Sequence, residues 1–282
     1  MIFMEDMVRN SEGFIELKRT YSELYKKVNY TADVQYVVDH IYEYDIRSAN
    51  TSALRASKLI DPKILTMLEG LNKQAREEAI GKMIRREKQS KKNTIYKAIS
   101  DGIQSAKEKL FRINHIQDKD VLAIKNDAVF IIGRKLKYTK FGPFEFRPKH
   151  TYMGYLNIDK IEFYYDKRNK SITIKGIRDE VVEDPDHQKG MIQFFLQVFK
   201  YLSMDQRDEL RQFLIQFVRD YKAKNLPHYY YKELNGENIY RTVYEIAGFE
   251  YNLLEIGEKD MDIINPVYNY TRFILPIIRM FM

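Results

Sequence analysis

The sequence predicts an α+β protein in which strands and helices are gathered in blocks rather than regularly alternating. Short runs of β-branched and aromatic residues between turns occupy 36–46 and 121–177. Residues 61–113 have almost no strand signal, and the segment after 185 is helical again. The chain has 282 residues, of which 44% are hydrophobic and 31% charged, which suffices for one large domain or two small ones.

The composition excludes several kinds of chemistry and favours one kind of partner. The chain has no cysteine, so disulfides, thiolate zinc sites and cysteine nucleophiles are excluded. We expect no membrane segment and a cytoplasmic location, because the sequence has neither a typical signal peptide nor a long apolar run. The net charge of +7 favours an anionic partner, most simply nucleic acid.

The first strong feature is an acid at the end of a predicted strand. An amphipathic helix is predicted at 14–28, and the strand at 36–46 follows it and carries Asp45 near its end. Small polar residues then lead into a short predicted helix at 49–57. This layout suits a metal or phosphate site. It equally suits an ordinary turn, because Asp, Ser, Asn and Thr are common turn and cap residues.

A basic helical block follows. Asp61 and Pro62 are a typical helix start, and we expect two or three helices with breaks near Gly70, Gly81 and Gly102. Within sixteen residues, one acid, Glu87, faces seven bases: Lys82, Arg85, Arg86, Lys88, Lys91, Lys92 and Lys97. Salt bridges along the helix cannot balance such a run. It indicates either a phosphate-binding surface or a solvated one.

The second half begins with a predicted hairpin. The run VLAIKNDAVFII at 121–132 has its polar tip at Lys125, Asn126 and Asp127. Further strands are predicted at 141–146, 151–157, 160–165 and 171–177. Residues 203–206 read as a capping box that opens a helix to about residue 222.

Asp45 and Asp127 together predict a magnesium-dependent site. A strand end and a neighbouring hairpin tip supply carboxylates from adjacent backbone positions. Two metal ions held by such carboxylates stabilise the attacking and leaving oxygens of nucleotidyl transfer. Mg²⁺ takes hard oxygen ligands and keeps several waters, so two protein carboxylates suffice, and Mn²⁺ is an alternative. The basic helices between them would hold a triphosphate or a template.

Four segments resemble motifs of family B DNA polymerases in the same order. YDIRSANTSAL, beginning at Tyr44, resembles the first palm motif, D-x-x-S-L-Y-P-S. NTIY at 93–96 is similar to the N-S-x-Y of the fingers helix. KNDAVFI resembles the palm motif Y-G-D-T-D-S, with Asp127 on its second Asp, and ITIKGI at 172–177 is similar to the following K-G-I/V strand. The resemblance covers about residues 36–177.

This resemblance implies a polymerase-like palm, an antiparallel sheet with helices, over residues 1–184. Fingers-like helices would lie at about 61–115, and 185–282 would form a helical thumb-like or accessory region. The implied function is a template-directed nucleotidyltransferase, either a minimal DNA polymerase or a primer-synthesising one. Its partners would be nucleic acid and nucleoside triphosphates. A phage or mobile-element origin, and hence the host cytoplasm, is also implied.

The resemblance assigns roles to named residues. Asp45 and Asp127 would be the catalytic metal ligands. Nucleotide binding would involve Ser48, Asn50, Lys88, Lys92 and Tyr96. Nucleic-acid binding would involve Arg85, Arg86, Lys91, Lys125 and Lys175. Asn50 stands where the family has an aromatic sugar gate, which implies weakened rejection of ribonucleotides, and a comparison of dNTP with NTP incorporation tests this.

Departures from the family pattern keep other functions open. Lys125 occupies the first acid position of the hairpin motif, Lys97 stands where Gly is usual, and Gln89 stands where the leading Lys would fall. One alternative is a non-catalytic nucleic-acid-binding protein on a degenerate palm. Another is a structural or interaction protein whose basic helices meet an acidic partner. Carboxylates of Asp45 and Asp127 within about 5 Å of each other would favour the enzyme.

Overall fold

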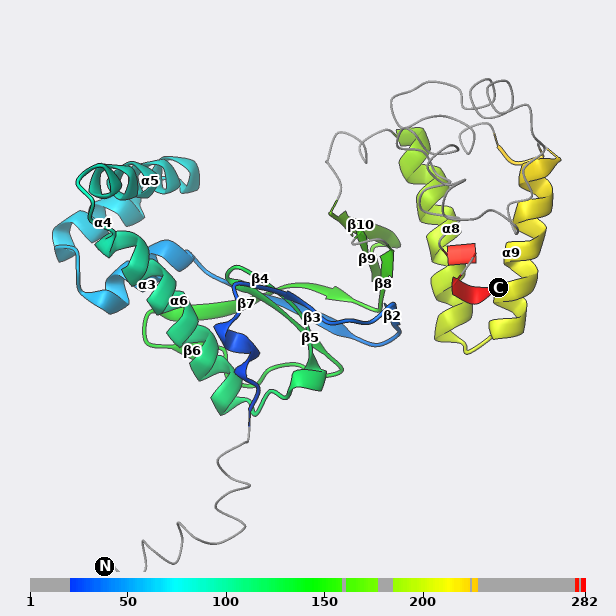
Figure 1. Ribbon diagram of the computed structural model, residues 1–282, viewed down its shortest axis with the longest axis horizontal. Helices are drawn as coiled ribbons and strands as arrows, with labels where there is room; N and C mark the ends of the chain where they lie inside the picture. Colours follow the sequence, from blue (N-terminus) through cyan, green and yellow to red (C-terminus); the bar gives the residue numbers. More distant parts are fainter. Residues whose placement is uncertain (1–20, 159–160, 177–184, 224, 228–276, 279) are drawn as a thin grey trace, which may run out of the picture. The chain divides into compact units, whose positions relative to one another are not determined.

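The computed structural model describes residues 21–158, 161–176, 185–223, 225–227, 277–278 and 280–282. This part of the chain is α+β with antiparallel sheets, as predicted (Figure 1). Contacts divide the chain into two compact units, one of residues 1–33 and 40–151 and one of residues 34–39 and 152–282. The units therefore divide near 151, whereas the sequence placed a boundary at 184. The assignment of 1–184 as a palm and of 185–282 as a thumb-like or accessory region stays a prediction.

The first unit is built on a six-stranded sheet with the order β1-β4-β5-β3-β7-β6. Its strands are β1 Asn29–Thr31, β3 Ile41–Ile46, β4 Val121–Lys125, β5 Ala128–Ile132, β6 Lys140–Phe141 and β7 Phe144–Tyr152. The single strand predicted at 36–46 is wrong: β2, Tyr36–Val37, pairs instead with β8 of the second unit. The exposed polar residues Asp39 and His40 separate the two β-prone runs.

The hairpin predicted at 121–132 is confirmed. Lys125 pairs with Ala128, so Asn126 and Asp127 form a two-residue turn, and Asn126 adopts a φ of 55°. Strand β5 also pairs with β3 in an antiparallel register that sets Asp45 opposite Ala128. The hairpin tip therefore lies beside the end of β3.

Helices follow β3 in the order predicted. They are α3 Ala49–Ser57, α4 Pro62–Gly70, α5 Lys73–Gln89 and α6 Thr94–Ile113. Asp61 caps α4 by accepting a hydrogen bond from the backbone N–H of Lys63 at 2.7 Å. The helix predicted at 14–28 lies partly outside the described residues, and its described part holds only a short 3₁₀ turn, Glu23–Lys26, before β1.

The breaks predicted at Gly81 and Gly102 are wrong, because both glycines lie inside helices, α5 and α6. The break predicted near Gly70 is confirmed, because α4 ends there and the chain turns at 71–72, and the next turn lies around 90–93. Gly102 has a packing role. A Cβ atom placed on it would lie 2.8 Å from the Cβ of Ala53 on α3. The absence of a side chain at 102 thus lets α6 approach the helix that begins beside Asp45.

Strand β3 has two different faces, because successive side chains of a strand point to opposite sides. Tyr42, Tyr44 and Ile46 join the hydrophobic core of the first unit, which also takes residues from α3 to α6. Glu43 and Asp45 lie on the opposite face. Burial of the aromatic face fixes which side of β3 carries the acids.

In its described part, the second unit holds a four-stranded sheet with the order β10-β9-β8-β2, and the helices α8 and α9. Its other elements are β8 Gly154–Ile158, β9 Ile161–Asp166, β10 Ser171–Lys175, α8 Pro185–Ser203 and α9 Arg207–Lys222. The predicted capping box at 203–206 is wrong. Ser203 ends α8 and donates its hydroxyl to the carbonyl of Lys200 at 2.8 Å, and Asp205 adopts a left-handed φ of 53° between the two helices.

Candidate active site

Asp45 and Asp127 are brought together at the edge where β3 ends and the β4–β5 hairpin turns. Their carboxyl groups lie within hydrogen-bonding reach of each other. Burial raises the pKa of the Asp127 carboxyl, and the adjacent Asp45 carboxylate raises it further. Two carboxylates this close repel each other when both are ionised, so the pair favours a bound proton or cation.

Charged residues occupy every second position at the end of β3 and along the neighbouring strand β7. We call this set the charge ladder: Glu43 and Asp45 on β3, Arg47 just after the end of β3, and Glu145, Arg147 and Lys149 on β7. At one end, the Nζ of Lys149 lies 3.6 Å from Oε1 of Glu43 and 3.8 Å from Oδ2 of Asp45. At the other end, Arg47 contacts Glu145, and its backbone N–H also donates to the carbonyl of Glu145 at 2.9 Å. Opposite charges facing each other in this way stabilise the pairing of two strands.

Glu145 is surrounded by cations. Its Oε2 lies 3.4 Å from Nη1 of Arg47 and 3.3 Å from Nη2 of Arg147, and its Oε1 lies 3.1 Å from Nζ of Lys140. A hydrogen bond from Lys140, together with the charge of Arg147, lowers the pKa of the Glu145 carboxyl. One carboxylate thus faces three cations, and positive charge is left over at this end of the ladder.

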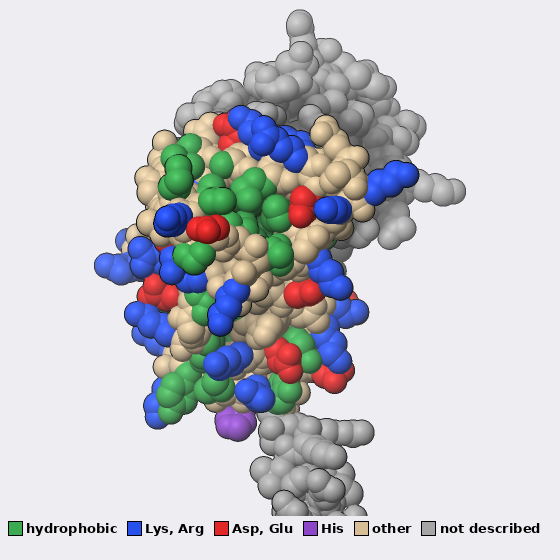
Figure 2. Space-filling view, turned by 90° about the vertical axis from the view of Figure 1, so that its left-hand side faces the viewer, with side chains coloured by type: hydrophobic (Ala, Val, Ile, Leu, Met, Phe, Trp, Pro, Cys, Tyr) green, Lys and Arg blue, Asp and Glu red, His purple; other side chains and the backbone are tan. Residues whose placement is uncertain are grey.

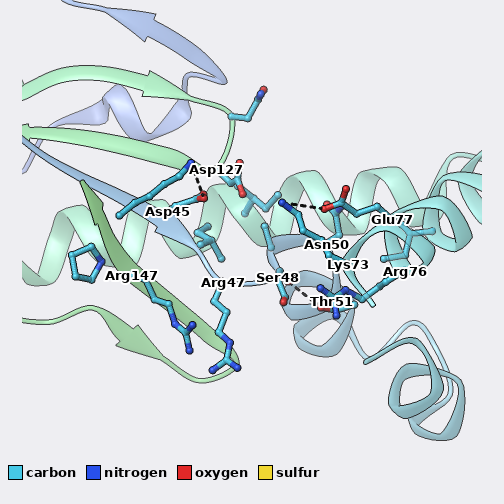
Figure 3. Close-up of a pocket in the computed structure, with 17 residues that line it drawn as sticks. Asp45, Arg47, Ser48, Asn50, Thr51, Lys73, Arg76, Glu77, Asp127 and Arg147 are labelled. Carbon is cyan, nitrogen blue, oxygen red and sulfur yellow. Dashed lines mark hydrogen bonds and ion pairs between the residues drawn. The ribbon is translucent and has the colours of Figure 1, made fainter. Parts of the chain in front are cut away.

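A cavity of about 700 Å³ joins the carboxylate pair to cations of several elements (Figure 3). It is lined by Asp45, Asp127 and Glu77 together with five cations: Arg47, Lys73, Arg76, Arg147 and Lys149. Lys73 and Arg76 come from the first turn of α5, and the other three come from the charge ladder. The excess of five cations over three carboxylates favours a ligand with negative charge, such as a phosphate group.

The start of α3 also faces this cavity, through Ser48, Asn50 and Thr51. Ser48 adopts a left-handed φ of 49°, which is uncommon for a residue other than glycine. Among the described residues, its hydroxyl makes no capping hydrogen bond. The hydroxyls of Thr51 and Ser52 bond instead to the carbonyls of Ser48 and Arg47, at 3.0 and 3.1 Å. The side chain of Ser48 is therefore not used as the ordinary helix cap.

Lys107, on α6, holds the tip of the β4–β5 hairpin by hydrogen bonds to the backbone. Its side chain is buried, with 3% exposed, and donates to the backbone carbonyls of Lys27 at 2.7 Å and Asn126 at 3.2 Å. Burial lowers its pKa to about 8, although the charge of Asp127 acts in the opposite direction. This lysine fixes the backbone beside Asp127.

We expect the stability of the protein to rise between pH 7.5 and pH 9.5 through Lys107. Its pKa is about 8 in the folded chain and 10.5 unperturbed, so in this interval the unfolded chain binds more protons than the folded one. The free energy of unfolding then increases with pH, here by about 2 kcal/mol. Urea unfolding at the two pH values should show this increase in the wild type and in Lys97→Met, an exposed lysine of the same helix, but not in Lys107→Met. An equal increase in all three proteins would contradict it.

Most basic residues singled out in the sequence lie away from this cavity. Five of them, together with the predicted nucleotide-binding residue Tyr96, are exposed on the C-terminal part of α5, the following turn and the start of α6: Arg85, Arg86, Lys88, Lys91 and Lys92. Figure 2, which faces this side, shows Lys and Arg side chains outnumbering Asp and Glu. Glu87, the single acid of the run, accepts a hydrogen bond from the N–H of Ile95 at 2.7 Å and so helps to begin α6. The nucleotide and nucleic-acid roles of these six residues stay predictions.

The other two residues predicted to bind nucleic acid, Lys125 and Lys175, are also not among the residues that line the cavity. Lys125 donates to the Oγ1 of Thr31 on β1 at 3.1 Å. Lys175 belongs to β10 of the second unit, where its Nζ lies 5.1 Å from the centre of the Tyr164 ring. Their contact with nucleic acid stays a prediction.

The sequence reasoning missed four cations of the cavity: Lys73, Arg76, Arg147 and Lys149. Lys73 and Arg76 are followed directly by Glu77 and Glu78, so residues 73–78 have no net charge. Arg147 and Lys149 do carry a signal, because residues 145–149 read E-F-R-P-K, with charge at every second position of a strand. That alternation indicates a charged strand face, and only the pairing with β3 shows which acids it meets.

The carboxylate pair fits a hydrated divalent cation. Among the described residues, no group of three or more His, Asp or Glu side chains is placed to hold a metal ion. Mg²⁺ is nevertheless commonly bound by one or two carboxylates with water and substrate phosphates as the remaining ligands. Asp45 and Asp127 supply those oxygens, and a cation would relieve the repulsion that raises the pKa of Asp127. Mn²⁺ suits the same oxygen ligands.

The fold and this site define an α+β protein with a carboxylate pair in a cation-rich cavity. The chain belongs to the family of the Bacteriophage PBS1 gene 130 protein, whose family model matches residues 20–282. This membership supports the predicted phage origin. No curated protein matches the chain. No helix in the described part of the chain is long and apolar enough to cross a membrane.

Proposed function

We propose that this protein is a template-directed nucleotidyltransferase that uses Mg²⁺ or Mn²⁺ and acts on nucleic acid and nucleoside triphosphates. One observation carries the proposal: Asp45 and Asp127 lie within hydrogen-bonding reach on the wall of a cavity with five cations. Nucleotidyl transfer needs divalent cations beside phosphate groups, and it depends mainly on positioning and charge neutralisation. The order of the motifs that resemble a family B palm adds support.

Each part of the cavity has a place in this proposal. Asp45 and Asp127 hold the cations, which when bound neutralise charge on the reacting phosphate. The first turn of α3, with Ser48 and Asn50, and the cations of α5 face the triphosphate. Lys107 holds the hairpin tip so that Asp127 keeps its position. The exposed basic residues of α5 are available to a template strand.

A non-catalytic nucleic-acid-binding protein on the same fold is the second candidate. Lys149 favours it, because its ammonium group already lies 3.8 Å from Asp45 and supplies a positive charge beside the pair. Lys125, at the position of the missing hairpin acid, favours it too. This candidate predicts salt-sensitive binding to nucleic acid with no need for a metal ion.

Primer extension and de novo synthesis on single-stranded DNA test the two candidates, with Mg²⁺ or Mn²⁺ present. We expect nucleotide incorporation by the wild type and a loss of about a thousandfold or more in Asp127→Ala, because a lost metal ligand removes several kcal/mol of transition-state stabilisation. Asp101→Ala is the matched control, since Asp101 is an exposed acid on α6. Nucleic-acid binding without incorporation in the wild type would favour the second candidate.

A further inference from the structure

We propose that Arg47 and Arg147 form a clamp for a terminal phosphate group that carries about two negative charges. We call this pair the arginine clamp. Its role in a reaction rests on the proposed nucleotidyltransferase function, but its binding of phosphate does not. The group would come either from the triphosphate end of a nucleotide, including released pyrophosphate, or from the 5′-phosphate of a strand.

The clamp is built by two strands and one carboxylate. Arg47 follows the end of β3, Arg147 lies in β7, and Oε2 of Glu145 contacts both guanidinium groups, at 3.4 and 3.3 Å. Figure 3 shows the two side chains next to each other at the cavity. A shared carboxylate limits the positions that the two guanidinium groups can take. Part of the entropy cost of ordering them is thereby met before a ligand binds.

The two arginines keep donors for a ligand. Their side chains are 59% and 49% exposed, and each guanidinium carries five N–H donors. Contact with one oxygen of Glu145 uses a minority of these donors. The planar guanidinium matches a phosphate group with two parallel hydrogen bonds, which a lysine cannot reproduce.

The charge of the cluster selects the type of phosphate. Three cations, Arg47, Arg147 and Lys140, surround Glu145, which leaves two positive charges. A terminal phosphate carries about two negative charges near neutral pH, whereas a phosphate within a strand carries one. Lys149 does not belong to this cluster, because it contacts Glu43 and Asp45.

The position of the clamp connects it to the carboxylate pair. Arg47 comes two residues after Asp45, just past the end of β3, and two residues of extended chain correspond to about 7 Å. Both arginines line the cavity that holds Asp45 and Asp127. A phosphate chain with one end at the carboxylates therefore reaches the clamp with its other end.

Isothermal titration with pyrophosphate, in buffer with EDTA, tests the clamp apart from any metal ion or reaction. We expect binding to weaken at least about tenfold in Arg147→Gln, since a charged hydrogen bond contributes about 1.5–3 kcal/mol. Arg147→Lys should weaken it similarly, because the charge stays and the planar donor pair is lost. Arg134→Gln should bind as the wild type, since Arg134 is another ion-paired arginine, with Asp120, but does not line the cavity.

Binding of oligonucleotides with and without a 5′-phosphate separates the two sources. A 5′-phosphate preference that Arg147→Gln abolishes assigns the clamp to a strand end, and clamp-dependent pyrophosphate binding without that preference assigns it to the nucleotide. Equal binding of both probes by Arg147→Gln and wild type would overturn the clamp. Unchanged binding by Arg147→Lys would also overturn it, because charge alone would then suffice. Clamp-dependent binding by a protein with no incorporation activity would reject the nucleotidyltransferase and keep the clamp.

Discussion

Asp127→Asn should make the metal-free protein more stable at pH 8 while it removes nucleotide incorporation. Burial and the charge of Asp45 both disfavour the ionised Asp127 carboxylate in the folded chain. The amide keeps the shape of the side chain and has no charge. We expect a gain on the order of 1 kcal/mol, which raises the melting temperature by about 2–4 °C in a domain of this size. A binding site that keeps repelling charges at a cost in stability would behave in this way.

The pH dependence of this gain has a definite sign. The pKa of Asp127 is raised in the folded chain above its ordinary value of 3.8. At pH values between 3.8 and the raised pKa of the folded chain, the folded protein binds more protons than the unfolded one. The free energy of unfolding of the wild type therefore falls as the pH rises across this interval. The advantage of Asp127→Asn should therefore be present at pH 8 and vanish near pH 4.

Thermal melts with and without Mg²⁺ complete the measurement. A cation that binds the folded protein stabilises it in proportion to its affinity. Mg²⁺ should therefore raise the melting temperature of the wild type and leave Asp127→Asn unchanged, and Asp101→Asn should respond as the wild type. A lower melting temperature of Asp127→Asn at pH 8, or an equal response of all three proteins to Mg²⁺, would contradict the metal assignment.

Two glycines inside helices should respond in opposite ways to the same substitution. Gly102→Ala places a Cβ 2.8 Å from the Cβ and 3.1 Å from the Cα of Ala53, so the two helices must move apart. We expect a loss of about 1–3 kcal/mol from this overpacking, partly offset by the better helix propensity of alanine. Gly81→Ala should instead stabilise by about 0.5–1 kcal/mol, because no described atom lies within 4 Å of the added Cβ.

Chemical denaturation of the two variants and the wild type gives these differences directly. Gly102→Ala should also weaken Mg²⁺ binding, because α3 begins four residues after Asp45 and moves with Ala53. Gly81→Ala should leave Mg²⁺ binding unchanged. Stabilisation by both substitutions would show that α3 and α6 can separate without cost, and glycine would then have no packing role at residue 102.

The hairpin and the acid at the end of β3 could be predicted from the sequence because both are local. Lys125, Asn126 and Asp127 are polar residues between two apolar runs of strand length, and this pattern favours a two-residue turn. The α+β class followed from the same kind of local pattern. The approach of Asp45 to Asp127 depends on one further fact, the pairing of β5 with β3, which local patterns do not contain.

The rest depends on contacts between residues far apart in the chain. The pairing of β3 with β7, which sets Lys149 beside Glu43 and Arg47 beside Glu145, joins segments about a hundred residues apart. Glycine at 102 indicates a helix break by propensity, and only the neighbouring helix gives the packing reason for it. The sequence at 36–46 is β-prone on both sides of Asp39 and His40, so propensity alone does not indicate that the chain changes sheets at these two residues.

The short strand β2 has a consequence for the order in which the protein can fold during synthesis. Val37 pairs with Tyr155, a separation of 155 − 37 = 118 residues, while most of the first unit lies between them in the chain. The ribosome therefore releases β2 well before its partner β8 exists. Contacts of such long range are slow to form. The edge strand β2 must therefore wait for the rest of the sheet of the second unit, which emerges only after most segments of the first unit.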